Sequence, residues 1–413
     1  MTERVFITGL GVVSSIGTGK EAFFASLEAG KSGIAPVQSF DAERIGRKFG
    51  GEVKDFRAAD HLARHEVRTL GRCSQMALAA ARMAARDAGL GDRDLAGPRV
   101  SVVLGTTMGD ADVLEVLDKA FITQGPEAIR PPAIPRYGAG LLPVHVARAF
   151  RAEGLTMTLP AACAAGNYSI GLAADLIRAG KADAVVAGAS ELLQQLQFAG
   201  FVKLQAMAPE KCQPFDKNRH GILLGEGAGI LVLESESRAR ARGARILAEV
   251  GGSVITCDRH HVTRPHPDAW GSITAMRQAI ANSGITTADV DFVNAHGTGT
   301  KANDVAETKV MREVFGERRV PLSSMKSMLG HCMGAASALE AIGCVFTLET
   351  GIYPPTINFE TPDPECDVEL VANVARKGKA DVVLNNSLAF GGYNSVVCFA
   401  RAGVLPPPRG GDS

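Results

Sequence analysis

One stretch decides the fold: Leu155-Thr-Met-Thr-Leu-Pro-Ala-Ala-Cys163-Ala-Ala-Gly-Asn-Tyr-Ser-Ile170. Its first five residues form a β-prone run, Pro160 interrupts that run, and apolar residues then recur at helical spacing until Gly180. The pattern predicts a short strand, a turn and a helix, with Cys163 on the turn. Backbone N–H groups and the helix dipole favour a thiolate at such a position, which makes Cys163 a candidate nucleophile. The alternative is a small buried apolar residue, and the rest of the chain has to decide between the two.

The composition is that of a globular protein and excludes several classes of function. The chain has 413 residues, of which 46% are hydrophobic, enough for a large core and for two domains. Lys plus Arg and Asp plus Glu are 44 each, so no net field favours nucleic acid or an anionic membrane. The eight cysteines are scattered singly, and neither a signal peptide nor an apolar run of about eighteen residues is present. We therefore expect a cytoplasmic protein without nucleic-acid or membrane partners.

Strand and helix patterns alternate along the chain. Strand-like runs occupy 99–104, 155–159, 184–188, 230–233, 246–254, 290–295, 320–324 and 382–386, and helix-like runs occupy 74–90, 164–180, 270–284, 304–314 and 335–348. This alternation predicts an α/β fold with a mostly parallel sheet covered on both faces. A charged helical run at 235–245 separates two halves, 1–245 and 246–413, and we expect the tail 404–413 to be disordered.

Two glycine-rich stretches could suggest a nucleotide site. Residues 5–14 predict a strand that enters a glycine turn, but Ser14 replaces the third glycine of a dinucleotide fingerprint and no acidic residue follows at the required distance. The stretch Gly225-Glu-Gly-Ala-Gly229 is not followed by Lys-Ser or Lys-Thr, so it indicates close backbone packing. Nucleotide binding is therefore not expected.

Four features lie directly after predicted strands or at predicted helix starts. They are Cys163, His296, His331 and the turn Phe390-Gly-Gly392. Because ligands gather at the carboxyl ends of the strands in an open parallel sheet, we expect these features to lie together. A thiolate nucleophile, two imidazoles and backbone N–H groups for an oxyanion are what acyl transfer through a thioester requires.

Five ordered motifs resemble the β-ketoacyl-acyl-carrier-protein synthases of the thiolase superfamily. Their order and spacing fit the chain-elongating branch of that family over residues 3–402. The five motifs are Ala161-Ala-Cys163-Ala-Ala-Gly, Asn294-Ala-His296-Gly-Thr-Gly-Thr300-Lys-Ala-Asn-Asp304, Ser324-Met-Lys326-Ser-Met-Leu-Gly-His331, Pro354-Pro-Thr-Ile-Asn358 and Phe390-Gly-Gly392. The resemblance implies a duplicated thiolase-like α/β/α/β/α sandwich of five layers. It also implies a decarboxylative Claisen condensation, in which Cys163 takes an acyl chain from an acyl-carrier protein and malonyl-acyl-carrier protein extends it.

The resemblance assigns roles to three basic residues of the second half. His296 and His331 match the two histidines that hold the malonyl thioester carbonyl and support decarboxylation, and the sequence leaves open which of them acts as the base. Their hydrogen bonds would stabilise the developing enolate. Lys326 matches a lysine that organises the site electrostatically.

Two acidic residues match partners of that lysine. Glu307 stands at capping-box spacing in a helix expected to begin at Asp304, so a helix cap is its alternative role. Glu340 lies inside an apolar run, where a buried carboxylate needs a partner such as Lys326.

The resemblance also implies where the substrates bind. The backbone N–H groups of Cys163 and Phe390 correspond to an oxyanion hole, and the Phe390 side chain to the gate of the acyl pocket. Thr298 and Thr300 match threonines that bind the pantetheine arm, and Met108 matches a residue that lines the acyl pocket. No bound cofactor is implied, because the phosphopantetheine arm arrives on the acyl-carrier protein.

A second mobile loop is implied at Asp258 and His261. A zinc site is the alternative interpretation of this region, and its candidate ligands are Cys257, His260, His261 and His266. Their spacing fits no common zinc motif, so no metal is expected.

Departures from the fatty-acid pattern bear on the substrate. Arg219-His220-Gly221-Ile222 replaces the usual Arg-Asp-Gly-Phe, and Leu388 stands where a phenylalanine commonly precedes the gate. The run Thr300-Lys-Ala-Asn-Asp304 is more similar to ketosynthases of type II polyketide systems. The resemblance therefore favours polyketide or polyene elongation over housekeeping fatty-acid elongation, with Ile222 and Leu388 deciding which acyl chains are accepted.

The same resemblance implies a dimer, either a homodimer or a heterodimer with a chain-length-factor-like paralogue. A helical stripe of Arg64, Arg68 and Arg72 is a candidate surface for an acidic carrier protein, and a solvated helix face is the alternative.

Three other functions remain to be weighed. Thiolases use a second cysteine as base, whereas this chain has His331, with Cys332 beside it. A non-catalytic, pocket-shaping partner subunit would not need the intact set of Cys163, His296 and His331. A cysteine hydrolase would need a group that activates water, and no such group is evident.

Overall fold

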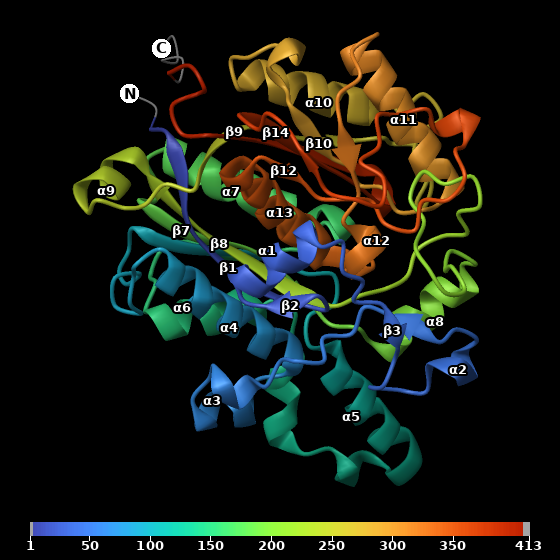
Figure 1. Ribbon diagram of the computed structural model, residues 1–413. Coiled ribbons are helices and arrows are strands. Elements are labelled where there is room, and N and C mark those ends of the chain that lie inside the picture. The colour runs from blue at the N-terminus through green and yellow to red at the C-terminus, as the bar shows by residue number, and fades with distance from the viewer. Residues whose placement is uncertain (1–2, 408–413) are drawn as a thin grey trace.

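Two sets of five strands, each of the same design, form the framework of the protein. The computed structural model describes residues 3–407 (Figure 1). The first set comprises β1 (Val5–Ser14), β5 (Val100–Gly105), β6 (Thr156–Leu159), β7 (Ala184–Glu191) and β8 (Gly227–Ser235). The second set comprises β9 (Ala248–Cys257), β10 (Phe292–Asn294), β11 (Leu322–Ser323), β14 (Val382–Ala389) and β15 (Tyr393–Ala400). The short strands are β2 (Gly17–Thr18), β3 (Ala35–Pro36), β4 (Phe49–Gly50), β12 (Ile352–Tyr353) and β13 (Arg376–Lys377).

The two sets have equivalent strand orders, β6-β5-β7-β8-β1 and β11-β10-β14-β15-β9. In each set the first three strands are parallel, and the last two run antiparallel to their neighbours. A short pairing of Phe6 and Ile7 with β9 joins the sets. The expectation of a mostly parallel sheet is therefore wrong for part of each set. The strand predicted at 382–386 is also not the last, because the turn at Phe390–Gly392 lets β15 return beside β14 as a hairpin.

Helices fill three layers around the strands. Helices α7 (Ala165–Arg178) and α13 (Ala336–Thr350) lie between the two sets (Figure 1). Helices α4 (Arg72–Asp87) and α6 (Leu141–Phe150) cover the outer face of the first set, and α10 (Trp270–Asn282) and α11 (Lys301–Phe315) cover that of the second. The expected five-layer α/β/α/β/α sandwich is thus confirmed. The other helices are α1 (Lys20–Glu28), α2 (Ala42–Ile45), α3 (Arg64–Thr69), α5 (Ala111–Gln124), α8 (Gln195–Lys203), α9 (Glu236–Ala241) and α12 (Lys326–Leu329).

The burial of strand side chains follows from these layers. Along β7, Val185 and Ala187 belong to the core around α7 and α13, whereas Ala184 and Val186 belong to the core under α4. Both faces of the strand are apolar because both are covered, which explains the continuous hydrophobic run in the sequence.

The duplication brings two equivalent turns together at the middle of the molecule. Strand β6 leads into α7 through a 3-10 turn at Ala162–Ala164, and β11 leads into α13 through α12 and a 3-10 turn at Met333–Ala335. Each turn begins with a residue at φ 46°. A non-glycine residue in this left-handed region is strained, and such strain is held in place by the surrounding packing. The first turn carries Cys163, and the second begins two residues after His331.

The glycines at the N-terminus have a packing role. Strand β1 continues to Ser14 without the glycine turn that the sequence suggests. A Cβ atom at Gly9 or Gly11 would lie 2.1 Å or 1.8 Å from a backbone oxygen of α4. The two glycines therefore allow α4 to lie directly on β1, and they form no nucleotide site.

Two expectations about the surface are modified, and one finding concerns membranes. Arg64 and Arg68 are exposed on α3, but Arg72 lies on α4 and pairs with the buried Glu226 at 3.0 Å, so the three form no single stripe. Leu405 is buried, whereas Val404, Pro406 and Pro407 are exposed, and 408–413 lie outside the described residues. Within residues 3–407, no helix is both long and apolar enough to cross a bilayer.

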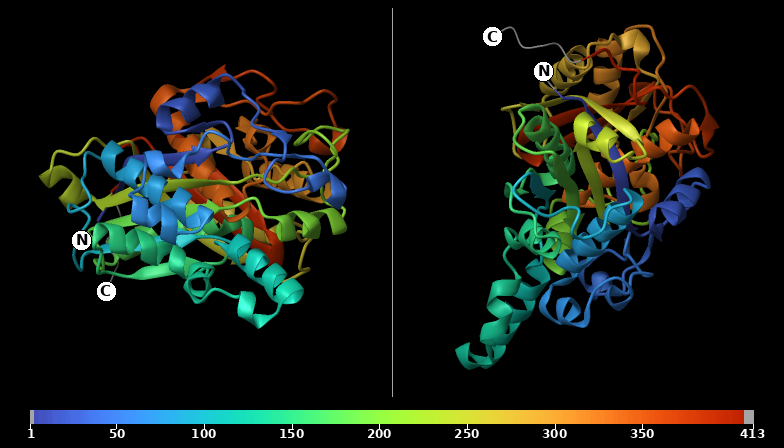
Figure 2. Two further views of the ribbon diagram at one scale, coloured as in Figure 1. Left: turned by 90° about the horizontal axis from the view of Figure 1, so that it is seen from below. Right: turned by 90° about the vertical axis from the view of Figure 1, so that its left-hand side faces the viewer.

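Helix α5 projects from the body of the protein (Figure 2, right). None of its side chains is buried, and its exposed apolar residues are Leu114, Val116, Phe121 and Ile122.

Candidate active site

Cys163 lies on the predicted turn between a strand and a helix. It is buried in a small apolar cluster with Phe198, Ile222 and Met333. Its carbonyl oxygen accepts hydrogen bonds from the hydroxyls of Ser337 at 3.2 Å and Ser387 at 3.3 Å. Two side chains of the second half therefore help to fix the position of this cysteine of the first half.

The protonation state of Cys163 differs from the expectation. Burial raises the pKa of the Cys163 thiol to about 12, while the charge of Lys326 and the backbone N–H of Phe390 act to lower it. The prediction that the helix start alone favours the thiolate is wrong, because desolvation outweighs the dipole. The contact with the Phe390 N–H nevertheless places that group beside the sulfur, as an oxyanion hole requires.

Two histidines share the cavity with Cys163. The ring centroids of His296 and His331 lie 5.5 Å apart with their planes at 81°. The Nζ atom of Lys326 lies 3.3 Å from Nδ1 of His296, and the backbone N–H of Met333 donates to Nδ1 of His331 at 3.1 Å. Both Nδ1 atoms therefore act as acceptors, since an ammonium and an amide can only donate. Each histidine consequently carries its hydrogen on Nε2.

Burial also keeps both imidazoles neutral. Desolvation lowers the pKa of His296 and of His331 well below the usual value, and the charge of Lys326 adds to the effect. The cavity thus holds two neutral Nε2–H donors, which can stabilise negative charge on a substrate oxygen.

Lys326 is held by an ion pair inside the protein. Its Nζ donates to Oε1 of Glu340 at 2.5 Å, and both side chains are 1% exposed. The expected pairing of these two residues is confirmed. Lys326 does not line the cavity, so it acts on the site through His296.

We expect the variant Lys326→Met to lose about 3–5 kcal/mol of the free energy of unfolding, because it leaves the Glu340 carboxylate buried without its cation. The double variant Lys326→Met/Glu340→Leu should recover most of this loss. Denaturant titration measures both effects. Equal stability of Lys326→Met and the wild type would contradict the proposed coupling.

Glu307 organises the loop that carries His296. Its carboxylate accepts the backbone N–H groups of His296 at 2.7 Å and of Gly297 at 2.5 Å, and the side-chain amides of Asn303 and Asn386. The helix begins at Lys301 and not at Asp304, so the capping-box alternative for Glu307 is wrong. The carboxylate caps the backbone of the catalytic loop instead.

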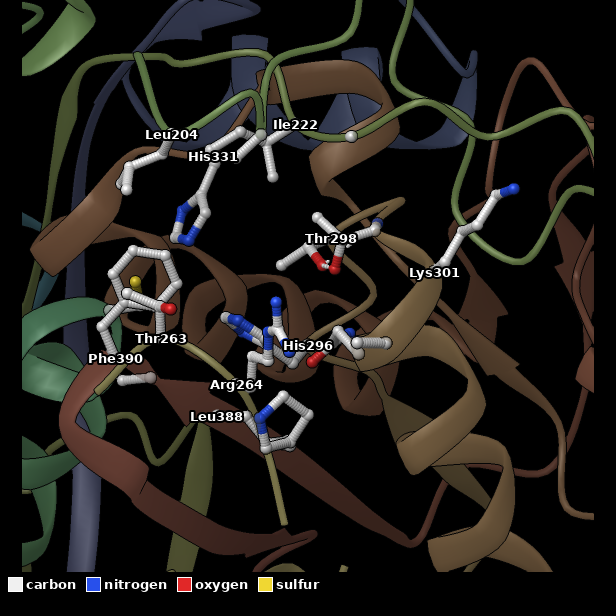
Figure 3. A pocket seen from close by; sticks show the side chains of 18 of the residues that line it. Leu204, Ile222, Thr263, Arg264, His296, Thr298, Lys301, His331, Leu388 and Phe390 are labelled. Carbon is white, nitrogen blue, oxygen red and sulfur yellow. Dashed lines mark hydrogen bonds between the residues drawn. The ribbon is translucent and has the colours of Figure 1, made fainter. Parts of the chain in front are cut away.

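A cavity of about 570 Å³ connects these groups with the surface (Figure 3). It is lined by Cys163, His296, His331, Thr298, Thr300, Ile222, Leu388, Phe390, Asp258 and His261, all predicted site residues. The hydroxyls of Thr298 and Thr300 are 2.9 Å apart. The ring of Phe390 stacks on that of Phe201 with centroids 5.6 Å apart.

Met108 is the exception among the predicted pocket residues. It does not line this cavity, because it lies on the turn after β5, where its backbone N–H donates to Glu191 at 3.1 Å. The buried Glu191 also accepts the N–H of Gly334, so it connects the turn of Met108 with the turn after His331.

The zinc alternative has no geometric support. The rings of His260 and His266 lie 4.9 Å apart, but no three His, Cys, Asp or Glu side chains of residues 3–407 come together as a metal-binding group. Asp258 instead accepts the amide of Asn394 and the N–H of His266.

Several cavity residues were not predicted as site residues. They include Phe201, Leu204, Arg264 and Lys301. Lys301 directly follows the Thr298-Gly-Thr300 motif, which could have drawn attention to it. Helix α8 and the segment after it, which supply Phe201 and Leu204, carry no motif.

Comparison with known proteins agrees with this geometry. Residues 2–239 match the N-terminal domain of β-ketoacyl synthases and residues 247–360 the C-terminal domain. The chain is 38% identical over 408 residues, 97% of this chain and 98% of the relative, to 3-oxoacyl-[acyl-carrier-protein] synthase 2 of Synechocystis sp..

Two solved structures show the same fold. A chain of the ishigamide ketosynthase/chain length factor superposes with a TM-score of 0.94 at 43% identity, covering 98% of this chain and 100% of that one. The AntDE:AntF complex is a type II PKS acyl-carrier protein with its ketosynthase bound to the hexaketide. One chain of it superposes with a TM-score of 0.90 at 31% identity, covering 97% of this chain and 100% of that one. The chain therefore belongs to the β-ketoacyl synthase family of acyl-transferring condensing enzymes.

Proposed function

We propose that the protein condenses an acyl chain bound to Cys163 with malonyl-acyl-carrier protein, giving a β-ketoacyl-acyl-carrier protein in type II polyketide or polyene biosynthesis. One observation carries the proposal: a buried thiol, an oxyanion-hole N–H and two neutral Nε2–H donors face one cavity. This set provides a nucleophile and stabilises negative charge on oxygen.

Acyl loading uses the first half of the site. The Cys163 sulfur attacks the carbonyl carbon of an acyl-carrier thioester, and the N–H groups of Cys163 and Phe390 bind the oxyanion that forms. The carbon–sulfur bond to the carrier then breaks, and the thiol proton leaves with the carrier thiol. Because Cys163 is neutral in the free enzyme, its proton is lost only when a leaving thiolate is there to take it.

Condensation uses the two histidines. The malonyl thioester oxygen accepts hydrogen bonds from Nε2–H of His296 and of His331. The bond to the malonyl carboxylate breaks, carbon dioxide leaves, and its electron pair forms an enolate stabilised by these donors. The enolate carbon attacks the acyl-cysteine carbonyl, the thiolate of Cys163 leaves, and it takes up one proton.

The carrier arm requires a polar passage from the surface to the sulfur. Thr298 and Thr300 line the cavity between its mouth and the histidines and supply hydroxyls for the pantetheine amides. The phosphopantetheine remains attached to the carrier protein, so the enzyme needs no resident cofactor for this step.

The pathway proposal rests on the cavity wall and on the relatives. Ile222 and Leu388 are buried and line the cavity at two of the three positions where the sequence departs from the fatty-acid pattern, and His220, the third, lines it as well. The AntDE:AntF structure is that of a type II PKS ketosynthase, and the ishigamide structure is that of a ketosynthase/chain length factor. Housekeeping fatty-acid elongation is the alternative, supported by the similarity to the Synechocystis synthase.

A chain-length-factor-like paralogue is the proposed partner. Among residues 3–407, strand β6 is an edge strand that pairs only with β5, and Leu155 and Met157 beside or within it are 38% and 37% exposed. Helix α5 adds further exposed apolar side chains. Unpaired edges and apolar surfaces of this kind are covered in stable proteins, here by a second subunit.

Co-expression with candidate paralogues, followed by size-exclusion chromatography and mass spectrometry, tests this partner. A one-to-one complex with a paralogue that lacks the cysteine is expected. An active homodimer that elongates chains alone would contradict the heterodimer and favour the fatty-acid alternative.

The neutral histidines predict a flat pH profile for decarboxylation. We expect Cys163→Gln to decarboxylate malonyl-carrier protein at a constant rate between pH 6 and pH 8, because burial lowers the pKa of both histidines well below the ordinary imidazole value and the neutral donors persist. Release of labelled carbon dioxide measures the rate. An inflection near ~6.5, where an ordinary imidazole titrates, would contradict the assigned protonation states.

A further inference from the structure

Two cations at the mouth of the catalytic cavity have no ionic partner. Lys301 and Arg264 line the cavity and are exposed to solvent. Within residues 3–407, neither side chain has an acidic group within the 4.0 Å of an ion pair. Arg219, a buried cation that also lines the cavity, is by contrast paired with Asp363 and Asp304. The two charges therefore remain available to a ligand.

The acidic residue of the cavity does not neutralise them. Asp258 is the carboxylate among the lining residues, and it is buried. One of its oxygens accepts the amide of Asn394 at 2.8 Å and the other the backbone N–H of His266 at 2.9 Å. The mouth is thus cationic, and helix α11, which begins at Lys301, adds the positive end of its dipole.

Lys301 lies at the exposed side of the cavity, away from the sulfur and the histidines. Cys163, His296 and His331 are buried, whereas Lys301 is exposed. In Figure 3, Thr298 lies between the histidines and Lys301, whose amine points away from them. A ligand whose thioester reaches Cys163 and whose amides pass Thr298 and Thr300 therefore presents its other end at this rim.

We infer that Lys301 and Arg264 bind the phosphate group of the incoming phosphopantetheine arm. This inference rests on the proposed function and specifies which residues hold the arm at its outer end. A phosphodiester is an anion with oxygen acceptors, and Lys and Arg are its usual ligands. Holding the arm at both ends positions the thioester over the sulfur, and the contact needs no residue of the carrier protein.

The test separates the phosphate from the rest of the arm. Acyl-phosphopantetheine and acyl-pantetheine, both free of carrier protein, are titrated into Cys163→Ala protein, which cannot be acylated. Dissociation constants are measured by calorimetry or ligand-observed NMR. We expect acyl-phosphopantetheine to bind about fivefold or more tightly than acyl-pantetheine, which is the size of effect that one or two exposed charged contacts give. Lys301→Gln in the Cys163→Ala background should remove most of this difference. Arg264→Gln should act in the same direction.

Lys181→Gln is the matched control, because Lys181 is exposed and lies outside the cavity. It should leave both constants unchanged. Equal dissociation constants of the two arms for the Cys163→Ala protein would overturn the inference. A Lys301→Gln substitution that weakened the binding of both arms by the same factor would also overturn it. An effect seen only with carrier-bound substrates would assign Lys301 to the carrier surface instead. Acylation of the wild type, followed by intact mass, tests the proposed function separately.

Discussion

Cys163→Ala is expected to abolish acyl loading and condensation. Among the described residues of the cavity, the Cys163 sulfur is the only nucleophile placed beside the N–H of Phe390. The backbone carbonyl of Cys163 accepts hydrogen bonds from side chains of α13 and β14, which hold the residue in place. Without it no thioester can form, so the protein should show no acyl adduct by intact mass after incubation with acyl-carrier protein. The fall in condensation should reach the detection limit of the assay.

Cys257→Ala is the control for this experiment. Cys257 is the one exposed cysteine of the eight, all of which are described, so any non-specific acylation would occur there. We expect this variant to keep the adduct of the wild type. An adduct of equal yield on Cys163→Ala would show that the nucleophile is a different residue.

His331→Ala and His296→Ala are expected to separate loading from condensation. Each variant removes one Nε2–H donor to the enolate oxygen, and loss of one such donor typically costs about a hundredfold or more in rate. Loading should survive better, because the Phe390 N–H and the sulfur are unchanged. Single-turnover loading by intact mass and steady-state product formation measure the two steps.

The matched control is His145→Ala, on α6 and outside the cavity. It should retain both activities. Condensation at the wild-type rate by either cavity variant would show that this histidine has no part in stabilising the enolate.

Much of the fold could be predicted because its patterns are local. The strand, turn and helix around Cys163 are confirmed as β6, a 3-10 turn and α7, since Pro160 and the helical spacing act within a few residues. The antiparallel strands β8 and β15 were harder to place, because pairing direction depends on partners distant in the sequence. The glycine turn expected at Gly9 and Gly11 is wrong for the same reason: the backbone of α4 that requires these glycines lies some seventy residues along the chain.

The candidate site also has features that local sequence patterns predict and features that depend on burial or on distant partners. The motifs identified Cys163, His296, His331 and the pair Lys326–Glu340, which the structure brings together. The thiol pKa was misjudged because the helix dipole is visible in the sequence, whereas the extent of burial is not. The alternative of a helix cap at Glu307 is wrong because the backbone N–H groups that its carboxylate accepts precede the helix by several residues.

The most direct test of the central claim is a product analysis by mass spectrometry. The purified protein is incubated with acyl-carrier protein and malonyl-carrier protein, with and without its candidate paralogue. The proposed mechanism predicts a carrier-bound product longer than the primer by one C2H2O unit, with one carbon dioxide released per extension and an acyl-enzyme on Cys163 as intermediate. Release of the free acid without extension, or extension without an acyl-enzyme, would contradict it.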